Sequence, residues 1–302
     1  MNRLLQYLKP SYPPVALLWD PPHLQAIRVD KVGRSAAIQV RHQEDIEEAP
    51  DGSLSLEGLS GDRLDSILVR LGDPKKISLV LSDAFFRTQI VKLTEFPRSE
   101  EERIQVLRWH VRKILDYPVE ACRMRYVVLR KDPSAFTVLV TTIPEEAIGS
   151  LERAFEEKGC QLGYVGLETL ELYHTALSRD MFTAEGVSLL LNRTKEGLGF
   201  LFVETGSPFF YRYRYLSYVD DEDPDRVAQE IRLTLAFHRE RNAASPVRRL
   251  IVRCWPPEKA LDLEPAVTDE EIVHMDQVRP PLAEDAFRRS AALPLANLLV
   301  GH

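Results

Sequence analysis

Hydrophobic and polar positions alternate along the first part of the chain in a way that predicts short strands followed by a helix. Apolar runs of five or six residues are separated by Pro21 and Pro22 and by a turn, which is typical of an antiparallel meander. A polar, acidic stretch then indicates a loop or hairpin extension. The expected elements are strands 15–19, 24–29 and 36–40, loop 41–58, helix 62–71 and strand 77–81.

The middle of the chain predicts a strand-helix-strand-strand unit followed by a second helix. Ser99 and Glu102 have the spacing of a capping box, and an apolar stripe at helical period follows them. Trp109 and His110 fall partly off this stripe. Pro144 is expected to open the second helix, and Gly159 to cap it. The expected elements are strand 85–93, helix 99–115, strands 124–129 and 135–142, and helix 144–158.

Residues 209–215, Phe-Phe-Tyr-Arg-Tyr-Arg-Tyr, combine aromatic and basic side chains. In a strand, the residues at odd positions lie on one face, and Phe210, Arg212 and Arg214 lie on the other. We expect the aromatic face to be buried, and the arginines to face solvent or the acidic segment 220–225. Such a run can also stack single-stranded nucleic acid, which is the less favoured interpretation.

Composition narrows the class of protein. The chain has 302 residues, 44% of them hydrophobic and 28% charged, and a formal net charge of −7, so nucleic acid is not expected as a partner. Cys122, Cys160 and Cys254 are far apart in sequence and are expected to be reduced thiols. No apolar run is long enough to span a bilayer, and the N-terminus lacks signal-peptide features. We therefore expect a cytoplasmic protein without a direct membrane span.

The first ten residues leave two interpretations open. Leu4, Leu5 and Leu8 can share one helical face with Arg3 and Lys9 nearby, as in a short amphipathic membrane anchor. The alternative is an arm packed on its own domain.

The sequence gives little indication of a catalytic site or a metal site. None of the seven histidines stands three or four residues from another histidine or a cysteine, so no metal site is expected. No Gly-x-Ser-x-Gly elbow occurs either. Consecutive backbone N–H donors, which a phosphate-binding loop requires, are missing after Asp20, because Pro21 and Pro22 follow it.

Several connected stretches resemble a known family. They comprise 79–93, the helix 100–120 with Arg108 and Trp109 and a closing Tyr117-Pro118 pair, the strand and helix at 138–158, and the helix 226–241 with Glu230, Ile231 and Arg232. Together they resemble the type IV pilus assembly protein PilM, a member of the actin-like ATPase superfamily alongside FtsA.

This resemblance implies a fold and a role. The expected fold class is α/β, an actin-like (ribonuclease H-like) two-lobe fold. The first lobe would comprise 1–81 and 144–182, an inserted FtsA 1C-like α+β subdomain 82–143, and the second lobe 183–302. The implied role is a scaffold held at the inner membrane by the N-terminal cytoplasmic tail of a PilN-type bitopic protein, with self-association possible. A GspL-like cytoplasmic domain of a type II secretion system is the alternative role.

The sequence departs from the family at all three nucleotide-binding elements. Asp20 is followed by prolines, Asn192 to Lys195 replace the second phosphate loop, and Trp255 lies in a Cys-Trp-Pro-Pro segment where a glycine-rich turn is expected. We therefore expect no nucleotide cofactor and no ATPase activity. The alternative is a residual ATP switch that uses Asp20 and Lys195.

The family resemblance also places a partner-binding groove between the first lobe and the inserted subdomain. The candidate lining residues are Phe85, Phe86, Ile90, Leu107, Trp109 and Val111.

Overall fold

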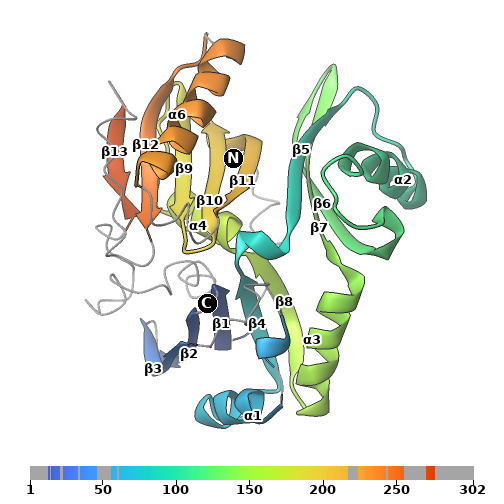
Figure 1. The fold of residues 1–302 in the computed structure, drawn as a ribbon, viewed down its shortest axis with the longest axis vertical. Coiled ribbons are helices and arrows are strands. Elements are labelled where there is room, and N and C mark those ends of the chain that lie inside the picture. Colours follow the sequence, from blue (N-terminus) through green and yellow to red (C-terminus); the bar gives the residue numbers. More distant parts are fainter. Residues whose placement is uncertain are drawn as a thin grey trace. The chain divides into compact units, whose positions relative to one another are not determined.

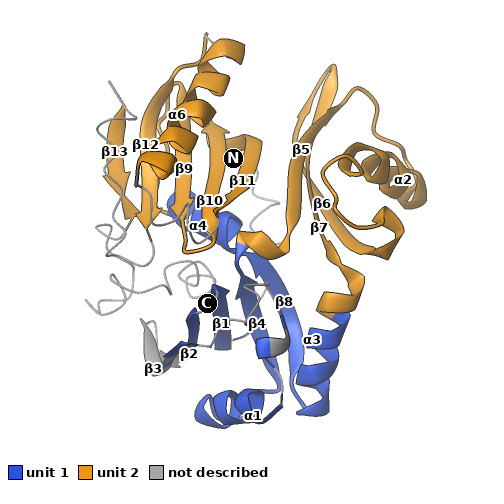
Figure 2. Ribbon diagram, in the orientation of Figure 1, with its two compact units in different colours: residues 1–82, 149–178, 276–302 blue, residues 83–148, 179–275 orange. Residues whose placement is uncertain are grey.

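The computed structural model describes residues 13, 15–20, 23–32, 35–45, 56–59, 61–216, 224–242, 244–254 and 270–275. They form two compact units, coloured separately in Figure 2. Unit 1 takes its described residues from the chain up to Ser82 and from Gly149–Ser178, and unit 2 from Asp83–Ile148 and Arg179–Met275. Among these residues, no helix combines the length and apolar character needed to cross a bilayer.

Unit 1 is built on one five-stranded sheet with the order β3-β2-β1-β4-β8. All six residues of the central strand β1 are buried, because its near-continuous apolar sequence lies between neighbours on both sides. β1, β2 and β3 form the predicted antiparallel meander, and β4 and β8 continue the sheet in parallel. The strands are β1 (Val15–Asp20), β2 (His23–Val32), β3 (Ser35–Asp45), β4 (Lys76–Leu81) and β8 (Gln161–Leu167).

The helices of unit 1 are α1 (Gly61–Arg70), α4 (Glu168–Ser178) and most of α3 (Glu145–Glu157), which begins in unit 2; a 3₁₀ turn, Leu56–Gly58, precedes α1. α3 buries Ile148, Leu151 and Phe155 at helical spacing, as predicted. Gly159 has a φ of +70°, and the Cys160 N–H donates to the Phe155 carbonyl at 3.0 Å. The predicted glycine cap is therefore confirmed.

The larger sheet of unit 2 has the order β11-β10-β9-β12-β13. Its helix α6 (Pro224–Arg241) runs along the sheet in Figure 1 and packs Val227, Ile231 and Leu235 into a core that includes Leu189 and Phe200. The strands are β9 (Val187–Arg193), β10 (Gly197–Glu204), β11 (Ser207–Tyr215), β12 (Val247–Cys254) and β13 (Glu271–His274).

The second part of unit 2 is the strand-helix-strand-strand unit predicted from the sequence. A 3₁₀ turn η3 (Asp83–Phe85) leads into a three-stranded sheet, order β5-β7-β6, against which α2 (Glu100–Val111) packs. The Ser99 hydroxyl accepts a hydrogen bond from the Glu102 N–H at 3.3 Å, which confirms the predicted N-cap. The remaining elements are β5 (Arg87–Leu93), η4 (Val119–Ala121), β6 (Cys122–Asp132) and β7 (Ala135–Pro144).

The two large sheets share one topology. In each, a three-stranded antiparallel meander is followed by two strands that add in parallel beside the first strand of the meander. The sequence shows no repeat that would reveal this. The predicted boundaries 1–81 with 144–182, 82–143 and 183–302 remain a prediction.

Several predicted boundaries were wrong. β3 continues to Asp45, inside the expected loop, because β2 offers backbone partners as far as His23. The strand expected from residue 85 begins at Arg87, since η3 occupies the preceding residues. The helix expected to reach residue 115 ends at Val111.

The interpretation of residues 209–215 was also wrong in part. Arg212 and Arg214 form ion pairs with Glu230 of α6, at 3.0 and 3.2 Å, because their face of β11 lies beneath that helix. Among the aromatics of the other face, Tyr211 is buried but Tyr215 is 47% exposed. The acidic segment 220–223 and the first ten residues lie outside the described residues.

Two positions on α2 test this packing. Leu107 is fully buried and Trp109 is 66% exposed. We expect Leu107→Ala to lower the free energy of unfolding of unit 2 by about 2–5 kcal/mol, and Trp109→Ala to change it by less than about 0.5 kcal/mol. Urea denaturation of both variants measures this, and equal losses would contradict the assigned face of α2.

Candidate functional site

The carboxyl ends of three parallel strands of unit 1 bring polar residues to one edge of the sheet. Trp19, Leu81 and Leu167 are aligned across β1, β4 and β8. The residues that follow them, Asp20, Ser82 and Glu168, are all fully buried. Open α/β sheets bind ligands at this kind of edge, so Asp20 lies where the sequence analysis placed the first phosphate-binding element.

Asp20 is the last residue of β1, at the end of the β1–β2 pairing. Asp20 pairs with His23 across the β1–β2 hairpin, and the His23 ring bonds the Asp45 carboxylate at 2.6 Å. The backbone N–H of Ser82 donates to the Trp19 carbonyl at 2.9 Å, so this donor already has a partner inside the sheet. Within the described part of the chain, no three His, Cys, Asp or Glu residues are grouped so that they would hold a metal ion.

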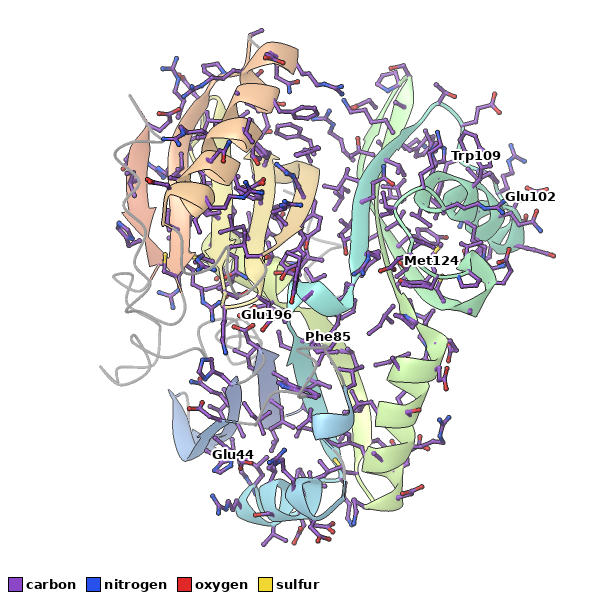
Figure 3. The ribbon with its side chains drawn as sticks, viewed as in Figure 1. Glu44, Phe85, Glu102, Trp109, Met124 and Glu196 are labelled. Carbon is purple, nitrogen blue, oxygen red and sulfur yellow. The ribbon has the colours of Figure 1, made fainter. Side chains whose placement is uncertain are left out.

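The second predicted element is the turn between β9 and β10, where Figure 3 labels Glu196. The Thr194 N–H donates to the Gly197 carbonyl at 2.9 Å, which closes the turn on itself. A Cβ at Gly197 would collide with the carbonyl oxygen of Arg214 on β11. This glycine is therefore explained by close packing of two strands, and Lys195 lies in the same turn, half-buried.

Asn192, at the end of β9, belongs to a buried polar cluster that we call the Asp83 cluster: Asp83, Asn192, Tyr211 and Arg253. The Asn192 side-chain amide donates to one Asp83 carboxylate oxygen at 3.3 Å, and its oxygen accepts from Arg253 at 2.9 Å. The Tyr211 hydroxyl donates to the other Asp83 oxygen at 3.1 Å. All four side chains are at most 6% exposed.

The Asp83 cluster holds η3 to three strands of the larger unit-2 sheet, β9, β11 and β12. Both ends of the Asn192 amide are engaged in these bonds. Because the Thr194 N–H is also used, neither the Asn192 amide nor this N–H is left to be presented to a ligand at the predicted phosphate loop.

The sequence analysis missed most of this cluster. Asn192 was singled out, but Asp83, Tyr211 and Arg253 were not. Two signals were present: Asp83 directly follows an apolar strand, and Asn192 and Arg253 each stand near the end of one. Their meeting depends on the parallel register that aligns Arg253 with Asn192, which no local pattern specifies.

Trp255, at the third predicted element, lies outside the described residues. The preceding strand β12 ends at Cys254, which is half-buried.

The two other thiols are poor nucleophiles. Burial raises the pKa of Cys122, and burial likewise raises the pKa of Cys160. Because the thiolate is the reactive form, neither residue is suited to covalent catalysis at neutral pH.

Five of the six predicted partner-binding residues belong to η3, β5 and α2, and Phe86 lies between η3 and β5. Leu107 and Val111 lie in the core between α2 and its sheet, and Phe86 is 8% exposed. Phe85 and Ile90 are half-buried. Their role as a groove remains a prediction.

Trp109 differs from the other five because it is open to solvent. At 66% exposure it is the most exposed large apolar side chain among the described residues, and Figure 3 labels it on α2. The His110 ring stands edge-on to it at 4.9 Å, and the Lys113 ammonium lies 5.9 Å from the ring centroid. An exposed tryptophan with a cation beside it is a common anchor in protein interfaces.

Removal of Asp83 tests the buried cluster. We expect Asp83→Ala to destabilise unit 2 by about 3–5 kcal/mol, because it leaves the buried donors of Asn192 and Tyr211 without their acceptor. Tyr211→Phe, which removes one bond to a charged group, should cost about 1.5–3 kcal/mol. The control is Asp116→Ala, which breaks an exposed 2.6 Å ion pair with Arg87 and should cost at most about 1 kcal/mol. Similar losses by chemical denaturation for Asp83→Ala and Asp116→Ala would refute the structural role of the cluster.

Comparison with known proteins was made by sequence and by structure. No protein-family model matches the sequence, and no curated protein matches it. The structure is similar to a chain of the PilM-PilN type IV pilus biogenesis complex, with 16% identity and a TM-score of 0.71 over 97% of this chain and 99% of that one.

Two further solved structures share the fold. A Bacteroides thetaiotaomicron protein with an actin-like ATPase fold and unknown function is 11% identical, with a TM-score of 0.59 over 99% of this chain and 98% of that one. The cytoplasmic domain of EpsL, an inner membrane component of the type II secretion system of Vibrio cholerae, is 10% identical, with a TM-score of 0.54 over 95% and 94%. The predicted fold class and the resemblance to PilM are thereby confirmed at the level of structure: the chain has the actin-like ATPase fold.

Proposed function

We propose that this protein is a PilM-like scaffold of a type IV pilus or a related secretion platform. In this role it binds the N-terminal cytoplasmic tail of a PilN-type inner-membrane protein, and it neither binds nor hydrolyses ATP. The observation that carries the proposal is the shared fold, over nearly the full length of both chains, with a chain of the PilM-PilN complex.

The absence of nucleotide chemistry is supported by how the loops are built. The Asn192 amide and the Thr194 N–H are already bonded within unit 2, and the sequence after Asp20 contains two prolines. A nucleotide would have to break the buried Asp83 cluster to use Asn192 as a phosphate ligand. Asn192 and the rest of the Asp83 cluster therefore stabilise the fold, and we propose that the protein acts by binding other molecules at its surface.

The partner-binding surface that we propose is centred on Trp109 of α2, which is 66% exposed and can bury further area against a short apolar peptide. Of the other accessible members of the predicted set, Phe85 on η3 is half-buried, and Ile90 lies on the face of β5 away from α2, because Val91 and Leu93 face the helix. Leu107 and Val111 support this surface from the core beneath α2.

A second candidate is the cytoplasmic interaction domain of a type II secretion system. The similarity to the cytoplasmic domain of EpsL favours it. The two candidates differ in the partner that is bound, and a pull-down that compares tails from pilus and secretion components distinguishes them.

The nucleotide proposal is tested by thermal unfolding with Mg·ATP and Mg·ADP. A ligand at about 100 times its dissociation constant adds about 2.7 kcal/mol to the stability of the folded state, which raises the melting temperature by several degrees. We expect no shift at millimolar nucleotide. A saturable rise would overturn the proposal in favour of an ATP switch that uses Asp20 and Lys195.

The partner proposal is tested by calorimetric titration with a synthetic N-terminal tail of the PilN-type protein from the same genome. We expect Trp109→Ala to weaken binding at least ten-fold, about 1.4 kcal/mol, while the melting temperature stays close to that of the wild type. Val69→Ala is the matched control, because Val69 on α1 is equally exposed, at 65%. A tail that does not bind the wild-type protein, or binds all three proteins equally, would refute this surface.

A further inference from the structure

The outward face of α6 carries a strip of exposed apolar side chains. Leu233 is 53% and Phe237 is 39% exposed, and Ala236 is exposed between them. Their spacing of three and four residues places them on one face of the helix. This face is opposite to Val227, Ile231 and Leu235, which pack on the sheet, so the fold of unit 2 does not use it.

Arginines border this apolar strip on both sides. Arg226 and Arg241 are on the side of Phe237, and Arg232 and Arg239 are on the other, all of them exposed. Arg239 is paired with Glu270 at 2.7 Å. The helix has no lysine. Its exposed acids are Asp225 and Glu240, and Glu240 lies on the same face as the strip, three residues after Phe237 and four after Ala236. The exposed arginines outnumber these acids, so the face is apolar with an excess of positive charge, on a chain whose net charge is −7.

The neighbouring strand β11 extends this surface. The rings of Phe210 and Phe237 are 5.6 Å apart, and the Arg241 guanidinium lies over the Phe237 ring, 4.4 Å from its centroid. Arg212 and Arg214 are paired with Glu230, which leaves the arginines of α6 to set the charge of the face. We call the set Phe210, Arg232, Leu233, Phe237 and Arg241 the α6 face.

We propose that the α6 face binds an anionic phospholipid surface. An apolar strip with arginines on its flanks is the pattern of a helix that lies in the plane of a membrane interface, where apolar side chains enter the acyl boundary and cations meet the phosphates. Arginine also binds phosphate through paired donors. This contact goes beyond the proposed partner binding, and it orients the protein at the membrane.

Ring geometry and apolar area favour lipid over single-stranded nucleic acid. Bases stack on open aromatic faces, whereas Arg241 covers a face of the Phe237 ring. Leu233 and Ala236 offer a base no stacking surface, but both add apolar area that a bilayer can bury.

The test uses the full chain and vesicles of phosphatidylcholine with or without phosphatidylglycerol, in a co-sedimentation assay without any partner protein. We expect binding only to the anionic vesicles, and loss of binding in about 1 M salt, where the Debye length falls to about 3 Å. Leu233→Asp should weaken binding at least ten-fold. Each of Arg232→Gln and Arg241→Gln should weaken it about five-fold.

The matched control is Val69→Asp, which places the same charge at an equally exposed apolar position on α1. It should bind like the wild type, and all variants should keep the wild-type melting temperature. The proposal is overturned if the wild type binds vesicles with and without phosphatidylglycerol equally, or if Val69→Asp loses as much binding as Leu233→Asp. Competition by a single-stranded oligonucleotide at lower concentration than the vesicles would instead assign the face to nucleic acid. Because no tail peptide is present, failure here leaves the partner proposal standing.

Discussion

The buried carboxylate of Asp83 is the interaction on which the organisation of unit 2 depends. A carboxylate that is 1% exposed is stable only if its oxygens are bonded, and here Asn192 and Tyr211 bond one oxygen each. Arg253 bonds the far side of the same asparagine. These three residues come from β9, β11 and β12. The turn η3, which precedes the small three-stranded sheet, is therefore connected to the larger sheet by buried polar bonds. Loss of a partner in such a buried network is strongly destabilising.

The same cluster bears on chemistry as well as on stability. In α/β folds the carboxyl ends of parallel strands leave backbone donors and polar side chains for a ligand. In this chain, the Asp83 cluster at the end of β9 and the closed turn that follows it satisfy these groups internally. The tight turn at Gly197 serves strand packing against Arg214. This actin-like ATPase fold is thus compatible with the proposed role, which depends on surfaces alone.

Two exposed surfaces of unit 2 have different chemistry, which fits two different contacts. Trp109 is one large aromatic side chain with a lysine beside it, suited to anchoring a short peptide. The α6 face spreads smaller apolar groups between arginines, suited to an extended anionic surface. In the proposed role, the first contact holds the partner and the second orients the protein at the membrane.

Local signals in the sequence determined most of the elements and their class. The meander, the Ser99 cap, the Gly159 cap and the inward face of α3 follow from short-range patterns, because caps and hydrophobic periods act within a few residues. The resemblance to PilM added the fold class. Only the tertiary structure decided what depends on register between distant strands: the matching order of the two large sheets, the pairing of Arg212 and Arg214 with Glu230, and the Asp83 cluster. From the sequence alone, Asp83 is indistinguishable from an ordinary turn acceptor, because its partners in the cluster lie on strands much later in the chain.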